Sequence, residues 1–165
     1  MRLFGVTGWK DTGKTTLMER LVREISGRGF TVSTIKHAHH SFDVDHPGKD
    51  SFRHREAGAR QVLVSSRDRW ALMSENLGAS EPNLEEFLAK LDTVDLVLVE
   101  GYKCARHPKI ETVSASSRQE MIWREDPSIE AVASDAPIEE LSIPLFKRDD
   151  IFGLADFVLK RVGLI

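Results

Sequence analysis

The stretch from Gly8 to Thr15 restricts the fold of this chain more than any other feature, because it fits the pattern G-x-x-x-x-G-K-[ST]. The two glycines let the main chain turn tightly, so that several amide N–H groups point at one anion. Lys14 is expected to reach the β- and γ-phosphates of a nucleotide, and the Thr15 hydroxyl to hold Mg²⁺. The pattern therefore predicts a phosphate-binding P-loop. Its expected nucleotide-binding residues are Gly8, Trp9, Lys10, Asp11, Thr12, Gly13, Lys14, Thr15 and Thr16.

The segments on both sides of the motif agree with this interpretation. Residues 2–7 form a short apolar run that is typical of a strand. After the motif, apolar residues recur at helical spacing at Leu17, Met18, Leu21, Val22 and Ile25. The alternative is an ordinary glycine turn with an exposed lysine. A strand before the motif and a helix after it favour the P-loop.

Composition limits the class of protein. A length of 165 residues suggests one domain spanning residues 1–165, and 41% hydrophobic with 30% charged residues is typical of a globular protein. The net charge of -3 argues against a general nucleic-acid binder. No run reaches 18 apolar residues, so we expect no membrane-spanning helix, and the start resembles no cleavable signal. The single Cys104 rules out an intramolecular disulfide and favours the reducing cytoplasm.

Strands and helices are predicted to alternate along the rest of the chain. Strands are expected at residues 31–35, 61–66, 70–74, 95–99, 109–113, 131–133 and 144–146, and helices at residues 51–59, 83–91 and 151–162. Asp149 or Asp150 is expected to cap the last helix. This order predicts an α/β fold of the P-loop NTPase type, a three-layer sandwich with a mainly parallel sheet and helices on both faces. The short turn between residues 66 and 70 adds a β-hairpin.

A second acid is needed near Mg²⁺ at the carboxyl end of a neighbouring strand. Asp95 precedes the apolar run at residues 96–99, and Glu100 follows it. Five strand residues span roughly 17 Å, so only one of the two acids can lie beside the phosphates. Ligands of parallel sheets bind at the carboxyl ends of strands, which selects Glu100.

A long polar loop from residue 36 to about residue 50 carries many histidines and acids. Five histidines occupy positions 37, 39, 40, 46 and 54, and one hypothesis is a zinc site. The other is a loop over the nucleotide, with Asp43 near the Mg²⁺ ion, Asp45 near the attacking water, and Lys36, Lys49, Arg53 and Arg55 near phosphates. On this hypothesis the catalytic residues are Lys14, Glu100 and Asp45. A solvated polar loop without a specific role is the remaining alternative.

Three segments together closely resemble the MobB family of molybdopterin-guanine dinucleotide biosynthesis adapter proteins. They are GWKDTGKTTLMERL at residue 8, KHAHHSFDVDHPGKDSFRHREAGA at residue 36 and LVLVEGYK at residue 96. The resemblance implies a P-loop fold, binding of GTP and Mg²⁺, slow GTP hydrolysis and a homodimer. It also implies two partners, molybdopterin and the guanylyltransferase that attaches GMP to it.

Two details of the motif bear on this resemblance. Dimeric P-loop ATPases of the nitrogenase-iron-protein type carry an extra lysine where this chain has Trp9, so we do not assign Lys10 a catalytic role across a dimer. The guanine-reading motif N-K-x-D is absent from the sequence. Asp135 could place a carboxylate at the base, and residues 147–150 are a second candidate.

Two other functions remain open on the sequence. A small-molecule kinase would use the same P-loop, with Arg53, Arg55 and Arg60 as anion-binding groups. A non-enzymatic module that binds molybdopterin or a partner protein would not depend on Lys14.

Overall fold

The computed structural model describes residues 1–38, 42–114 and 120–165. These residues form two compact units. One consists of residues 1–37 and 84–165, and the other of residues 38–83.

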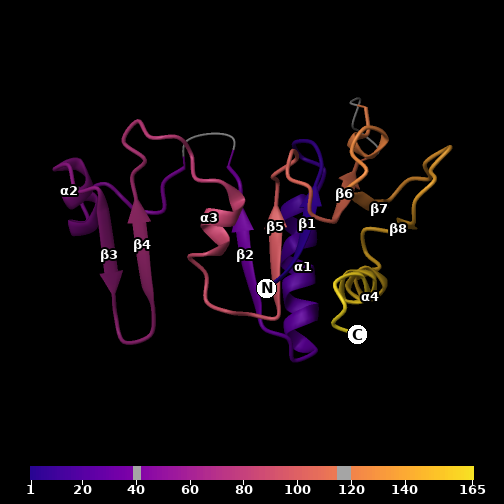
Figure 1. The fold of residues 1–165 in the computed structure, drawn as a ribbon, viewed down its shortest axis with the longest axis horizontal. Coiled ribbons are helices and arrows are strands. Elements are labelled where there is room, and N and C mark those ends of the chain that lie inside the picture. Colours follow the sequence, from indigo (N-terminus) through magenta and orange to yellow (C-terminus); the bar gives the residue numbers. More distant parts are fainter. Residues whose placement is uncertain (39–41, 115–119) are drawn as a thin grey trace. The chain divides into compact units, whose positions relative to one another are not determined.

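The first unit is built on a six-stranded sheet in which every pair of neighbouring strands is parallel (Figure 1). In spatial order the strands are β2 (Val32–Lys36), β5 (Leu96–Glu100), β1 (Arg2–Thr7), β6 (Lys109–Val113), β7 (Ile129–Ser134) and β8 (Leu145–Phe146). The helices of this unit are α1 (Lys14–Gly27), α3 (Leu84–Leu88), the short 3₁₀ helix η1 (Ile122–Arg124) and α4 (Ile151–Arg161).

One face of the sheet is covered by α1 and α4, which pack against each other. The core on this face joins the apolar stripes of both helices to alternate residues of the central strands. Its fully buried members include Leu21 and Ile25 of α1, Leu98 of β5 and Leu159 of α4. The continuous burial of β5, from Leu96 to Val99, is what a central parallel strand requires, because both of its faces are covered.

The opposite face of the sheet carries buried polar groups beside valines. The side chain of Glu111 in β6 accepts hydrogen bonds from the backbone N–H groups of Ile122 and Trp123, both at 2.9 Å, and so fixes the start of η1. Lys109 in the same strand is fully buried and pairs with Asp126 at 2.9 Å. The salt bridge and the hydrogen bonds satisfy charges that would otherwise be costly to bury.

The second unit contains α2 (Asp50–Glu56) and a two-stranded antiparallel hairpin of β3 (Gln61–Ser65) and β4 (Trp70–Ser74). Among the described residues, β3 and β4 pair only with each other. Their antiparallel pairing confirms the predicted hairpin.

The predicted fold class is confirmed. For most strands the observed bounds differ from the predicted bounds by one or two residues. Of the two capping candidates for α4, the structure selects Asp150, whose Oδ1 accepts from the Gly153 backbone N–H at 3.0 Å. The sequence did not predict η1.

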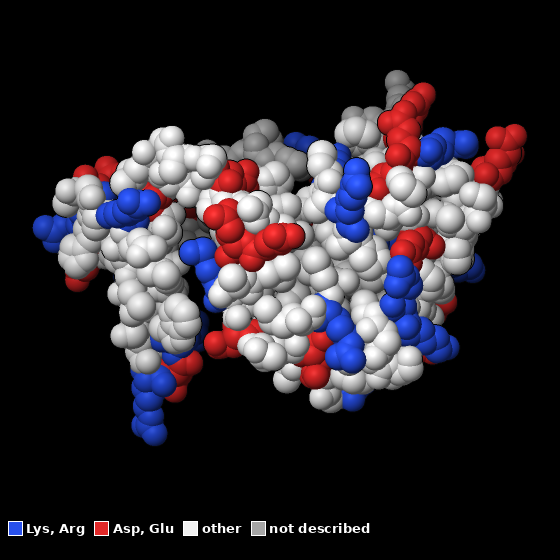
Figure 2. Space-filling view, in the orientation of Figure 1, with Lys and Arg blue, Asp and Glu red and all other residues white. Residues whose placement is uncertain are grey.

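In the described part of the chain no helix is both long and apolar enough to cross a bilayer. Figure 2 shows acidic and basic side chains interspersed over the face that it draws.

Candidate functional site

The P-loop connects the carboxyl end of β1 to the start of α1, as the sequence predicts. Three of its residues have positive φ angles: Gly8 at 141°, Asp11 at 62° and Gly13 at 89°. Gly8 also packs closely against β6, because a Cβ placed on it would lie 2.5 Å from the Thr112 carbonyl oxygen. The loop can therefore adopt this path only with glycine at position 8.

Threonine hydroxyls hold the loop against the sheet. The buried Thr12 donates its hydroxyl hydrogen bond to the Trp9 carbonyl at 2.8 Å, and its Oγ1 lies 2.8 Å from Oγ1 of Thr112. Thr112 in turn donates to the Thr7 carbonyl at 3.1 Å. These contacts make the loop rigid, so that its amides are already arranged for an anion.

Lys14 lies at the first position of α1 and donates from Nζ to the Trp9 carbonyl at 2.5 Å. Burial lowers the pKa of its ammonium group, Glu100 opposes this effect, and Lys103 lowers the pKa further. The ammonium group is thus partly desolvated and lies near another cation. Both conditions favour binding of an anion.

Thr15 and Glu100 are brought together at the mouth of the P-loop. The Thr15 hydroxyl donates to Oε1 of Glu100 at 2.8 Å, and Nζ of Lys36 lies 3.5 Å from the same oxygen. Asp95 lies before β5, at the opposite end from Glu100, where its carboxylate accepts from both the amide and the hydroxyl of Thr31. The strand-end argument therefore chose the acid that contacts the motif.

A hydroxyl and a carboxylate side by side fit Mg²⁺, which usually takes one or two protein ligands and completes its octahedron with phosphate oxygens and water. No group of three or more histidine, cysteine or acidic side chains that could hold a metal occurs within residues 1–38, 42–114 and 120–165. This finding gives the zinc hypothesis no support from the described histidines. His39 and His40 lie outside the described residues.

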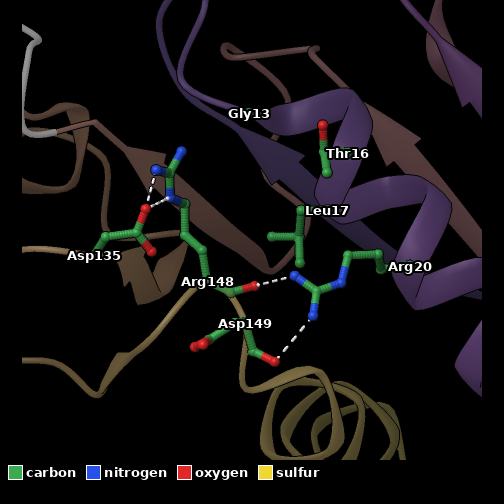
Figure 3. Close-up of a pocket in the computed structure, with 7 residues that line it drawn as sticks. All are labelled: Gly13, Thr16, Leu17, Arg20, Asp135, Arg148 and Asp149. Atoms are coloured by element: carbon green, nitrogen blue, oxygen red, sulfur yellow. Dashed lines mark hydrogen bonds and ion pairs between the residues drawn. The ribbon is translucent and has the colours of Figure 1, made fainter.

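A cavity of about 300 Å³ opens beside the start of α1 (Figure 3). Its lining comes from α1, from the end of β7 and from the segment before α4: Gly13, Thr16, Leu17, Arg20, Asp135, Arg148 and Asp149. Both sequence candidates for reading a base therefore reach the same cavity, Asp135 directly and the segment 147–150 through Arg148 and Asp149. Arg20 fixes the second segment by donating to the carbonyls of Arg148 and Asp149, both at 3.0 Å.

Arg148 links the cavity to the P-loop. Its guanidinium donates to the Thr12 carbonyl at 3.2 Å, and it binds Oδ2 of Asp135 through two nitrogens, with Nε at 2.7 Å. This ion pair holds the pKa of the Asp135 carboxyl below its usual value and raises that of Arg148. Asp135 is therefore an ionised acceptor at neutral pH, and both bonds from Arg148 end on only one of its two oxygens.

The predicted loop acids Asp43 and Asp45 belong to the second unit, where they surround Arg55. Both carboxylate oxygens of Asp43 accept from Arg55 at 2.9 Å, and Asp45 lies 3.6 Å from Arg55 Nε and accepts from the Ser51 hydroxyl. Glu75 binds the same guanidinium at 3.0 Å. Because three carboxylates compensate Arg55, the structure gives no support to its use as an anion clamp in a kinase.

The main residue that the sequence reasoning did not assign is Lys103, in the loop after β5. Its Nζ lies 3.7 Å from the centre of the Trp9 ring. The run LVLVEGYK carried this lysine three residues beyond Glu100, and that short separation from the acid that contacts the motif was the available signal. Lys10 is exposed, as expected for the tip of the loop.

The family model for molybdopterin guanine dinucleotide synthesis protein B, MobB, matches residues 3–135. The chain belongs to the MobB family. The molybdopterin-guanine dinucleotide biosynthesis adapter protein of Escherichia coli K12 is 43% identical over 162 residues, which cover 96% of this chain and 91% of the relative. The protein of the same name from Haemophilus influenzae is 41% identical, with 94% and 86% covered.

Solved MobB structures share the fold. The MobB homologue from Bacillus stearothermophilus has a TM-score of 0.74 at 30% identity, with the whole of both chains covered. Bacillus subtilis MobB has a TM-score of 0.79 at 26% identity, with 98% of each chain covered. The resemblance to the MobB family seen in the sequence is thus confirmed by both kinds of comparison.

Replacing Gly8 tests the geometry of the loop. Gly8→Ala introduces a strained φ and a clash with the Thr112 carbonyl, and we expect the free energy of unfolding to fall by about 2 kcal/mol or more. Urea unfolding followed by circular dichroism measures this change. Gly27→Ala is the matched control, because a Cβ there meets no atom within 4 Å and its effect should stay within about 1 kcal/mol. Equal stability of both variants would contradict the assigned loop conformation.

Proposed function

We propose that this chain binds GTP with Mg²⁺ at the P-loop, hydrolyses it slowly, and acts as an adapter for the guanylyltransferase that attaches GMP to molybdopterin. The adapter role is supported by the names of the relatives and by 43% identity over nearly the whole chain. The observation that carries the nucleotide-binding part is the contact of Thr15 with Glu100, directly beside Lys14 and the loop amides.

In the proposed complex the loop amides and Lys14 bind the β- and γ-phosphates. Mg²⁺, when bound, neutralises charge on the oxygens of both phosphates. Thr15 and Glu100 are the residues that would hold it. Asp43 is proposed to act near the ion and Asp45 to orient the attacking water. Slow turnover is expected from this set of groups, because Glu100 is committed to the metal and Asp45 is proposed to orient the water rather than to act as a strong general base.

The guanine base is proposed to occupy the cavity beside Gly13, with Asp135 as its reader. Guanine presents two N–H donors, at N1 and at the 2-amino group, which a carboxylate can accept together. Both guanidinium bonds from Arg148 end on Oδ2 of Asp135, so Oδ1 faces no competition from that guanidinium. The ionised state of Asp135 suits this role.

The homodimer that the resemblance implies is proposed to form through the β3–β4 hairpin. Leu63, Leu72 and Trp70 share one face of the hairpin because of its register, and their exposed fractions are 60%, 46% and 64%. A two-stranded sheet with such a face is marginally stable alone, and an apolar unpaired strand readily pairs with an identical one. A second copy of this chain therefore fits the surface.

Removing the P-loop lysine tests the nucleotide site. Lys14→Ala is expected to weaken binding of GTP with Mg²⁺ by about 100-fold, because charge-assisted bonds to two phosphates are lost. Isothermal titration calorimetry measures the affinity, and Lys90→Ala, at an exposed lysine outside the site, should bind as the wild type does. Unchanged GTP affinity in Lys14→Ala would refute the site. If the variant lost GTP but still supported the guanylyltransferase reaction, the binding-module hypothesis would be correct instead.

Base recognition is tested by exchanging donors and acceptors. Asp135→Asn is expected to weaken GTP binding at least tenfold and to improve binding of xanthosine triphosphate, because xanthine carries a carbonyl where guanine has the 2-amino group. Competition titrations with the two nucleotides measure the ratio. Asp149→Asn alters the second acid of the same cavity and should leave the ratio unchanged. If Asp149→Asn reversed the nucleotide preference and Asp135→Asn did not, Asp149 would be the residue that recognises the base.

The dimer is tested by placing a charge on the hairpin face. Leu63→Glu should shift the mass measured by light scattering after size-exclusion chromatography from that of two chains to that of one, because the charge would be buried in the interface. Arg67→Glu, at the exposed turn of the same hairpin, should remain dimeric. A wild-type chain of single mass would disprove the homodimer, and a dimeric Leu63→Glu would place the interface elsewhere.

A further inference from the structure

Three lysines converge on the P-loop from three elements of the first unit. Lys14 begins α1, Lys36 ends β2, and Lys103 follows β5. After burial, the charges that act on the Lys14 ammonium are Glu100, Lys103, Asp11 and Lys36, and the two other lysines both lower its pKa. Two further lysines thus act on the Lys14 ammonium beside Glu100 and Asp11, and such a group of cations is suited to a polyanion.

The path of the chain after β5 explains how Lys103 comes to lie there. Gly101 and Tyr102 have φ angles of 93° and 49°, so two consecutive residues adopt left-handed conformations. For the non-glycine Tyr102 this conformation is strained. A Cβ on Gly101 would lie 3.2 Å from the Cβ of His37. These two residues turn the chain so that Lys103 lies beside Trp9 of the P-loop. Backbone strain of this kind is typical of functional loops.

Trp9 holds two of these ammonium groups at once. Nζ of Lys103 lies 3.7 Å from the centre of its ring, whereas Nζ of Lys14 binds its carbonyl at 2.5 Å. The indole is itself anchored, because its N–H donates to the Glu120 carbonyl at 2.7 Å. The ring is therefore a fixed platform that keeps the Lys103 ammonium at the loop, where burial lowers its pKa and Glu111 raises it.

Lys103 lies beside the Trp9 ring, outside the lining of the cavity. The cavity is lined by Gly13 and Thr16, and neither Trp9 nor Lys103 contributes to it. Lys103 instead follows the strand that supplies Glu100, the acid beside Thr15. If the nucleoside occupies the cavity, the phosphate tail runs toward Trp9 and ends there.

We propose that Lys103, held on the indole ring of Trp9, binds the terminal phosphate of a nucleoside triphosphate and makes the site prefer triphosphate over diphosphate. The inference rests on the proposed nucleotide binding. Lys14 supplies affinity for both nucleotides through the phosphate that they share. Lys103 supplies the difference, and Trp9 acts as its positioning residue.

The test measures binding of a non-hydrolysable GTP analogue and of GDP, each with Mg²⁺, by titration calorimetry. Lys103→Met is expected to weaken the GTP analogue at least tenfold and GDP less than twofold, because one charge-assisted bond to the third phosphate is lost. Lys103→Arg should keep the preference, since a guanidinium also stacks on indole. Trp9→Leu should lose part of the preference for the GTP analogue over GDP, because the ring no longer positions Lys103. Arg106→Met removes a charge from an exposed position of the same loop and is the matched control.

The outcomes separate this inference from the proposed function. If the wild-type chain binds neither nucleotide, or Lys14→Ala binds both normally, the nucleotide site itself is wrong. If Lys14→Ala fails to bind but Lys103→Met retains the wild-type ratio of GTP to GDP affinity, only the role of Lys103 is refuted. Thermal unfolding checks that each variant is folded, and Lys103→Gln replaces Lys103→Met if the latter is not.

Discussion

The site depends on the parallel register of β1 with its two neighbours. Val6 of β1 lies opposite Glu100 of β5, and Glu100 in turn lies opposite Lys36 of β2. Val6, Glu100 and Lys36 therefore lie in one row across three neighbouring strands. In β1 this row lies two residues before Gly8, where the P-loop begins. A shift of one residue in this pairing would turn Glu100 to the other face and remove its contact with Thr15. The buried, apolar strand β5 fixes the register, so the hydrophobic core sets the geometry of the polar site.

The electrostatic balance of the site follows from which strands end there. Parallel strands bring all their carboxyl ends to one edge, where β2 ends at Lys36 and β5 at Glu100, with Lys103 in the loop that follows β5. The helix α1 adds the partial positive charge of its first turn to the same place. A polyphosphate with Mg²⁺ would compensate these charges. On the proposed function, the ligand thus completes the electrostatics of the fold.

The sequence predicted the parts of the site that depend on chain direction and local pattern. The P-loop and the choice of Glu100 over Asp95 needed only the alternation of elements and the rule for strand ends. The position of Lys103 could not be predicted, because it depends on two left-handed residues, one of them a tyrosine, and on the ring of Trp9 more than 90 positions away. The pairing of Asp135 with Arg148 is also tertiary, and local capping could not by itself decide between Asp149 and Asp150. The sequence did not predict η1, because three residues give no periodicity. The start of this 3₁₀ helix is fixed by hydrogen bonds to the side chain of Glu111 in β6.

Arg148 shows how the base cavity and the phosphate loop are physically connected. Its guanidinium spans from the Thr12 carbonyl, inside the P-loop, to the carboxylate of Asp135. On the proposed function, a base that bonds to the Asp135 carboxylate would weaken that ion pair and change the field on the loop carbonyl, because charged groups this close share their hydrogen-bonding capacity. On the proposed function, such coupling serves an adapter better than fast hydrolysis does, since its partner would need only to distinguish the nucleotide-bound chain from the free chain. The arrangement of cations around the loop is consistent with this proposed role, because these groups bind phosphate rather than accept a proton.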